Sequence, residues 1–132
     1  ISAGIALIAG GAGIGPIMGI LRELAEKEDR RPIHLVYGNR KISQMLFLEE
    51  FRVLGNQLDL EVLLVLEDSP EDFTGYKGFI DREVLSRLTE DPNHTNWDFY
   101  ICGPKPMVKA VEKNLEDLSV PRERILYEQL GF

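Results

Sequence analysis

Short apolar runs alternate along this chain with longer segments in which apolar residues recur every three or four positions. The runs have strand length and little polar alternation, which is typical of strands buried on both faces. They cover residues 5–9, 33–37, 60–66, 99–102 and 125–127. Helical spacing follows each of the first four runs, and parallel strands need such crossovers. The pattern therefore predicts an α/β fold, a doubly wound five-stranded parallel sheet with helices on both faces.

Proline and glycine mark the boundaries of these elements. Pro16 and Pro104 stand where a helix would begin, a position at which the missing N–H costs nothing. Pro70, Gly75 and Gly78 interrupt the chain after the third strand and predict a loop there. No repeat or second domain is visible. In such a sheet a ligand crevice lies outside the carboxyl ends of the strands, so the loops that follow the strands are the candidates for chemistry.

Composition and charge exclude several classes of protein. The chain has 132 residues, of which 44% are hydrophobic and 28% charged, as in one ordinary folded domain. Its 15 Lys and Arg against 22 Asp and Glu leave a net charge of −7, so we expect no nucleic-acid partner. No apolar run approaches the roughly 20 residues of a membrane span, and we expect no membrane contact by this domain. The single cysteine, Cys102, cannot form an internal disulfide, which fits a reducing compartment.

The most informative segment is the glycine-rich stretch GGAGIGP at residues 10–16, between the first strand and the first helix. Glycines let backbone N–H groups approach a phosphate, and a helix N-terminus attracts anions. The spacing departs from the G-x-G-x-x-G fingerprint, because its third glycine would fall at Pro16. The second strand also ends in YGNR rather than in an acidic residue for a ribose. Nucleotide binding is favoured, with an ordinary tight turn as the alternative.

The fourth strand ends in CGPKPM, with Cys102 followed by a glycine and a helix-starting proline. A lone cysteine here is equally consistent with a small buried residue and with a thiol that assists a transfer reaction at the crevice. Met107 first indicates a core residue. A Cys–His catalytic pair is disfavoured, because His34 is expected at the far end of its strand and His94 in a polar turn.

Five landmarks occur in order: GGAGIGP, YGNR, a loop containing GFID, CGPKPM and the tail YEQLGF. Together they resemble the NAD(P)H-binding half of the ferredoxin-NADP reductase superfamily, especially its bacterial ferric-reductase-like and oxygenase-reductase members. The resemblance implies a strand order of 3-2-1-4-5 and a single pyridine-nucleotide-binding domain over residues 1–132. Nothing matches the Arg-x-Tyr-Ser type motif of the family's flavin-binding domain, and the chain opens on Ile1. We therefore expect a fragment of a larger flavoprotein, inactive when isolated.

The resemblance also implies roles for individual residues. The segment 11–15 would cradle the pyrophosphate, the segment 37–40 would flank the adenosine, and the cysteine would act catalytically beside the hydride-donating carbon without a covalent intermediate. Ala12 replaces a Thr or Ser of many relatives, so a hydroxyl contact would be lost. The implied coenzyme or flavin contacts are Gly10, Gly11, Ala12, Gly13, Ile14, Gly15, Pro16, Tyr37, Gly38, Asn39, Arg40, Cys102, Gly103, Pro104, Met107, Glu128 and Phe132.

Coenzyme preference depends on the loop after the third strand. NADPH carries a 2′-phosphate that favours Arg or Lys. Where NADPH-specific plant-type relatives have a Ser-Arg pair, this chain has Leu66 and Glu67, followed by Asp68. Arg40 and Lys41 could offset part of the repulsion. We expect Glu67 and Asp68 to belong to the coenzyme site and NADH to be preferred over NADPH.

The function expected from this resemblance is a module that presents nicotinamide for hydride transfer to FAD or FMN. The flavin would be held by a flavin-binding domain of the same protein, and electrons would continue to a metal, haem or iron–sulfur acceptor. No metal site is expected in this chain. The alternative is a non-catalytic nucleotide-binding or electron-transfer subunit that docks on a separate flavoprotein or hydrogenase core. A methyltransferase lacks its acidic ribose contact. We expect a cytoplasmic location, free or on the cytoplasmic side of a membrane-bound parent.

Overall fold

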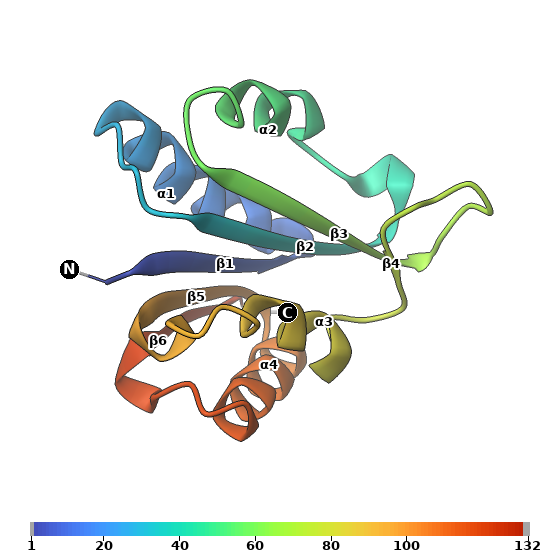
Figure 1. Ribbon diagram of the computed structural model, residues 1–132. Helices are drawn as coiled ribbons and strands as arrows, with labels where there is room; N and C mark the ends of the chain where they lie inside the picture. Colours follow the sequence, from blue (N-terminus) through green and yellow to red (C-terminus); the bar gives the residue numbers. More distant parts are fainter. Residues whose placement is uncertain (1, 131–132) are drawn as a thin grey trace.

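A computed structural model describes residues 2–130, which form a parallel six-stranded sheet in the order β4-β3-β2-β1-β5-β6 (Figure 1). The strands are β1 (Gly4–Gly10), β2 (Ile33–Lys41), β3 (Leu60–Asp68), β4 (Tyr76–Lys77), β5 (Trp97–Pro104) and β6 (Ile125–Leu130). All neighbouring strands run parallel, so their carboxyl ends meet at one edge of the sheet.

The sheet has one strand more than the five predicted, and its order is correspondingly different. The additional strand, β4, has two residues and pairs with Val65 and Leu66 of β3. It lies inside the segment that Gly75 and Gly78 marked as a loop. Two residues contain no hydrophobic period, so the pattern could not indicate a strand there. The five predicted strands are present, and their relative order, β3-β2-β1-β5-β6, is the one implied by the resemblance.

Two helices cover each face of the sheet (Figure 1). They are α1 (Ile14–Glu26) and α2 (Leu48–Leu54) on one face, and α3 (Arg82–Leu88) and α4 (Lys105–Asp117) on the other. Short 3-10 turns occur at Gly11–Gly13, Ile42–Gln44, His94–Asn96 and Arg122–Arg124. No helix within residues 2–130 has the length and apolar character needed to cross a membrane.

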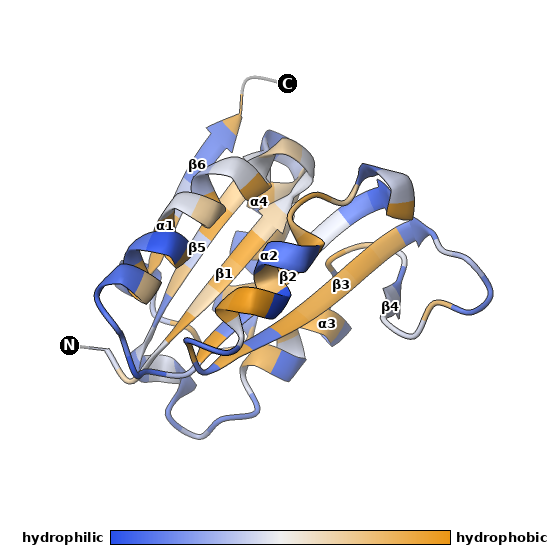
Figure 2. Cartoon of the chain, turned by 90° about the horizontal axis from the view of Figure 1, so that it is seen from above, coloured by the Kyte–Doolittle hydropathy of each residue, from blue (hydrophilic) through white to orange (hydrophobic). Residues whose placement is uncertain are grey.

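The core consists of two apolar clusters, one on each side of the sheet. Alternate residues of the inner strands enter different clusters: Leu7 packs with α1 and α2, whereas Ile8 packs with α3 and α4. Figure 2 shows the result, with the inner strands mostly in the hydrophobic colour and the helices carrying both hydrophilic and hydrophobic residues. Burial on both faces explains why the strand sequences show so little polar alternation.

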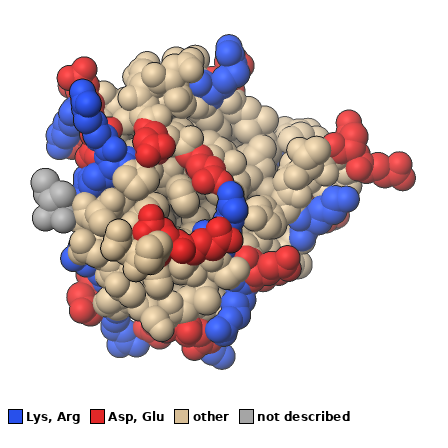
Figure 3. All heavy atoms as spheres, in the orientation of Figure 1, with Lys and Arg blue, Asp and Glu red and all other residues tan. Residues whose placement is uncertain are grey.

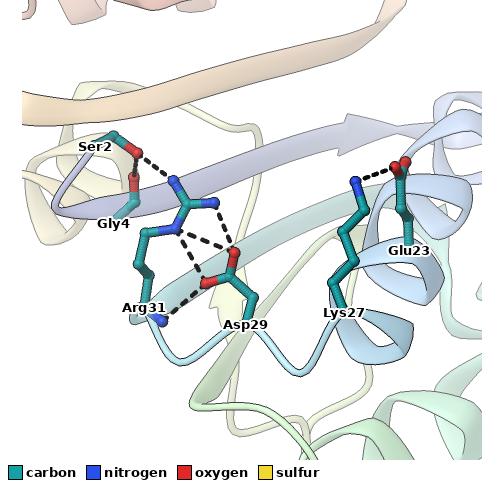
Figure 4. A network of polar contacts seen from close by, with 6 residues as sticks. All are labelled: Ser2, Gly4, Glu23, Lys27, Asp29 and Arg31. Atoms are coloured by element: carbon teal, nitrogen blue, oxygen red, sulfur yellow. Dashed lines mark hydrogen bonds and ion pairs between the residues drawn. The ribbon is translucent and has the colours of Figure 1, made fainter.

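A polar network anchors the start of β1 at the amino ends of the strands (Figure 4). Arg31 contacts the Asp29 carboxylate at 2.7 Å and donates to the Ser2 hydroxyl at 2.7 Å, while Ser2 donates to the carbonyl of Gly4. The hydrogen bond from Arg31 lowers the pKa of Asp29. These contacts tie the α1–β2 connection to β1 at the edge opposite the carboxyl ends.

Candidate functional site

A cleft of about 550 Å³ lies at the carboxyl ends of β1, β2, β3 and β5. Several of the expected coenzyme contacts come together in its lining: Gly10, Gly11, Gly38, Asn39, Arg40, Glu67, Pro104 and Met107. They lie on four different strands, in the turn after β1 and on α4, and only the parallel sheet brings them together. The cleft therefore occupies the place where an open α/β sheet binds its ligand.

The glycine loop leaves β1 by a conformation that side chains disfavour. Gly11 has φ +54°, in the left-handed region. At Gly13 an added Cβ would lie 2.0 Å from the carbonyl oxygen of Cys102, so the loop passes directly against the end of β5. The backbone conformation at Gly11 and the close packing at Gly13 therefore explain these two glycines without a ligand.

Gly15 differs from them, because neither its conformation nor its packing requires a glycine. It is exposed in the first turn of α1, and an added Cβ would meet no atom within 4 Å. No side chain caps the N-terminus of α1, nor that of α4, which begins after Pro104. Uncapped helix N-termini carry partial positive charge and free N–H groups. The loop and both helix starts are suited to an anion.

Met107 of α4 forms part of the wall of the cleft. Its sulfur lies 2.1 Å from the place of a Cβ on Gly10, and its terminal carbon 2.8 Å from that of a Cβ on Gly103. Glycines at the ends of β1 and β5 therefore allow this side chain to lie across both strand ends. Met107 packs partly into the core and partly lines the cleft.

A second hollow, a groove of about 310 Å³, lies between α1, β5 and β6. Pro16, Cys102 and Glu128 line it. Cys102 and Glu128 are register partners in the sheet, and the Cys102 Sγ donates to Glu128 Oε2 at 3.6 Å. Burial and the neighbouring Glu128 carboxylate raise the pKa of Cys102 to about 11. Near neutral pH this thiol is protonated, so it can donate a hydrogen bond but is a poor nucleophile.

The YGNR segment divides between the core and the cleft. Tyr37 is fully buried, and its hydroxyl accepts a hydrogen bond from the N–H of Leu46 at 3.1 Å. Asn39 donates to the carbonyl of Gln44 and accepts from the N–H of Arg40, which shapes the turn after β2. Arg40 is exposed on the cleft wall, and its Nε lies 3.2 Å from Asp68 Oδ2.

Other expected contacts line neither hollow. Gly13, Ile14, Tyr37 and Gly103 are buried, whereas Ala12, Gly15 and Asp68 are exposed outside both linings. Phe132 lies outside the described residues.

The GFID segment, for which no role was expected, lies in the cleft. Phe79 is 69% exposed at the cleft, and Ile80 packs toward Gly38. Gly78, with φ +105°, turns the chain so that both side chains reach this edge. The two adjacent apolar residues Phe79 and Ile80, in a loop with many polar residues, were the sequence feature that could have indicated this site. Gln44, Val65, Pro106 and Ala110 complete the lining.

The histidines do not enter either hollow. His34 lies near the amino end of β2, where its Nε2 is 3.3 Å from Glu61 Oε2, and His94 contacts backbone carbonyls. Within residues 2–130 no group of three His, Cys, Asp or Glu side chains could hold a metal ion. Acidic and basic side chains are interspersed on the face drawn in Figure 3, without a continuous basic patch.

The family model for the oxidoreductase NAD-binding domain matches residues 7–113. NADH-cytochrome b5 reductase 1 of Laccaria bicolor is 36% identical over 92% of this chain and 40% of the relative. NADH-cytochrome b5 reductase 2 of Aspergillus niger is 37% identical over 81% and 34%. The chain thus spans well under half the length of these relatives.

Two solved structures are similar in both fold and sequence. The flavohem-like FAD/NAD-binding domain of a nitric oxide dioxygenase from Vibrio cholerae has a TM-score of 0.83 and 27% identity, over 97% of this chain and 51% of that one. An Amycolatopsis cytochrome P450 reductase has a TM-score of 0.83 and 26% identity, over 96% and 37%.

Proposed function

The chain belongs to the oxidoreductase NAD-binding domain family, and on that premise we propose that it binds NADH across the two hollows and presents the nicotinamide to a flavin. The observation that supports this proposal is the arrangement at one sheet edge. A larger cleft and a smaller thiol-lined groove lie on either side of a glycine loop that ends in an uncapped helix. An elongated dinucleotide would fit this arrangement, with one half in each hollow and its central pyrophosphate at the glycine loop.

We propose that the adenosine half occupies the larger cleft. The exposed ring of Phe79 offers a stacking surface for a base, and Glu67 offers a carboxylate acceptor for ribose hydroxyls. The pyrophosphate would lie over the glycine loop, where the bare backbone at Gly15 leaves room for close approach. Tyr37 acts indirectly, because it holds the turn after β2 from inside the core.

The nicotinamide half would lie at the groove lined by Cys102. The coenzyme, when bound, supplies the hydride for the flavin. The contribution of this chain is to orient the ring: Cys102 provides a protonated thiol at a defined position, and Glu128 fixes the direction of that thiol by accepting its hydrogen bond. The apolar neighbours Pro16 and Ile17 would restrict water at the ring.

The names of the relatives support more specific proposals about which coenzyme, which flavin and which partner proteins are used. Two are named NADH-cytochrome b5 reductases, and Glu67 on the cleft wall would repel an additional phosphate, so we propose NADH rather than NADPH. The Vibrio cholerae domain is described as FAD/NAD-binding, which favours FAD over FMN. We propose that the flavin-binding domain belongs to the same protein and that a haem protein is the acceptor, as the names of cytochrome b5 and cytochrome P450 reductases indicate.

Isothermal titration calorimetry of the purified chain with NADH tests the binding proposal. Gly15→Val should weaken NADH binding by roughly tenfold or more, because branched carbons would keep the phosphates from the loop backbone and remove charge-assisted hydrogen bonds. Gly19→Val is the matched control: Gly19 is also exposed on α1, and an added Cβ there also meets no atom within 4 Å. Equal affinities for the two variants would contradict the proposed pyrophosphate site.

A further inference from the structure

The structure assigns to Asp68 a role that rests on the proposed function: it pairs with Nε of Arg40 and thereby competes with a 2′-phosphate for the cation on the coenzyme cleft. Asp68 acts through Arg40 and is a positioning residue. Preference for NADH would then depend on two acidic residues that act by different routes.

The contacts separate the two acidic residues clearly. Arg40 and Glu67 line the larger cleft, whereas Asp68 is not in the lining of either hollow within the described chain. The β2–β3 register pairs Asn39 with Leu66 and Lys41 with Asp68, which brings Arg40 opposite Glu67. The ion pair of Arg40 nevertheless forms with Asp68, from Nε to Oδ2 at 3.2 Å. Among residues 2–130 the carboxylate of Glu67 makes no side-chain hydrogen bond or ion pair, so it remains available to a ligand.

The chemistry of arginine explains why this pairing matters. A guanidinium presents a planar set of N–H donors that fits a phosphate in a bidentate manner. An arginine on a nucleotide cleft would therefore favour NADPH if its charge were not already paired with a carboxylate. With Nε directed at Asp68, a 2′-phosphate must compete with a carboxylate that is attached to the next strand and always present.

The pair is exposed, which limits its strength but not its effect on preference. Arg40 and Asp68 side chains are 66% and 54% exposed, so the pair contributes little to folding. A dianionic 2′-phosphate competes with the Asp68 carboxylate for the Arg40 cation. The free energies of these two pairings differ only modestly. Removal of Asp68 should therefore change coenzyme preference by about three- to tenfold without much change in stability.

The test uses four versions of the full chain: the unmodified chain, Asp68→Asn, Arg40→Gln and the double variant. Dissociation constants for NADH and NADPH are measured for each, and the readout is the ratio of the two constants. Asp68→Asn should favour NADPH by about three- to tenfold, and the same change in the Arg40→Gln background should have no effect. The shift should shrink at high salt, because exposed charges are screened.

Asp72→Asn is the matched control, since it removes one exposed carboxylate from the loop that follows Asp68 and should leave the ratio within twofold of the unmodified chain. If Asp68→Asn behaves like Asp72→Asn, or acts equally with and without Arg40, the masking role is overturned while the NADH site stands. If the unmodified chain binds neither coenzyme, the proposed function fails and the masking role falls with it. A thermal melt of each variant shows that the comparison is made between folded proteins.

Discussion

Gly13→Ala would place a methyl group against the end of strand β5. The Cβ would lie 2.0 Å from the carbonyl oxygen of Cys102 and 2.5 Å from its carbonyl carbon. Both are backbone atoms of a strand that pairs with β1 on one side and β6 on the other, so neither can rotate away. To reach even a 3.0 Å separation, the glycine loop and β5 would have to move apart by about 1 Å.

Overpacking of this kind typically costs about 1–3 kcal/mol. A loss of about 2 kcal/mol in a chain of 132 residues corresponds to a fall in Tm of about 7 °C. Urea unfolding measures the free energy of unfolding, and calorimetry measures Tm. Gly15→Ala is the matched control two residues later, where the new Cβ meets nothing within 4 Å. Because alanine is the better helix former, that variant should gain about 0.5–1 kcal/mol.

The two variants should therefore change stability in opposite directions. A Gly13→Ala protein that melts within 2 °C of the unmodified chain, with an unchanged unfolding slope in urea, would refute the close approach of the loop to β5 on which this reasoning depends.

Three further predictions concern the cysteine and the coenzyme. Cys102→Ser in the flavin-containing protein should slow hydride transfer roughly tenfold with little change in Tm; stopped-flow flavin reduction and a melt test this, and a normal rate with a lowered Tm would indicate a purely packed cysteine. Because the Cys102 thiol ionises near pH 9.0 when unfolded and near 11 when folded, its contribution to stability is present below pH 9 and lost as the pH rises toward 11. Urea unfolding across that range should show the loss, and Cys102→Ser should remove it. Glu67→Arg should raise the NADPH to NADH ratio of kcat/KM about tenfold to a hundredfold; an unmodified protein that already favours NADPH would show that Arg40 dominates the cleft.

The local pattern of the sequence was sufficient for most of the elements. Apolar runs and helical spacing predicted the five longer strands and all four helices, because burial on both faces leaves a short apolar run and burial on one helix face leaves a helical period. The glycine-rich stretch after β1 predicted a turn suited to phosphates. The strand order followed from the resemblance, since periodicity does not say which strands are neighbours.

The assembly of the site depends on contacts that form only in the folded chain. Three features illustrate this: the pairing of β4, the position of Phe79 at the cleft and the contact of Asp68 with Arg40. Each depends on segments that are distant in sequence or too short to carry a hydrophobic period. Tyr37 illustrates the same limit, because its place in the core depends on which face of β2 lies under α1 and α2. The positions of the longer strands and of the helices can be read from the amino-acid sequence, because each element buries its own apolar face. Packing decided which side chains reach the cleft, because that depends on register and on loops whose residues meet only when the sheet is complete.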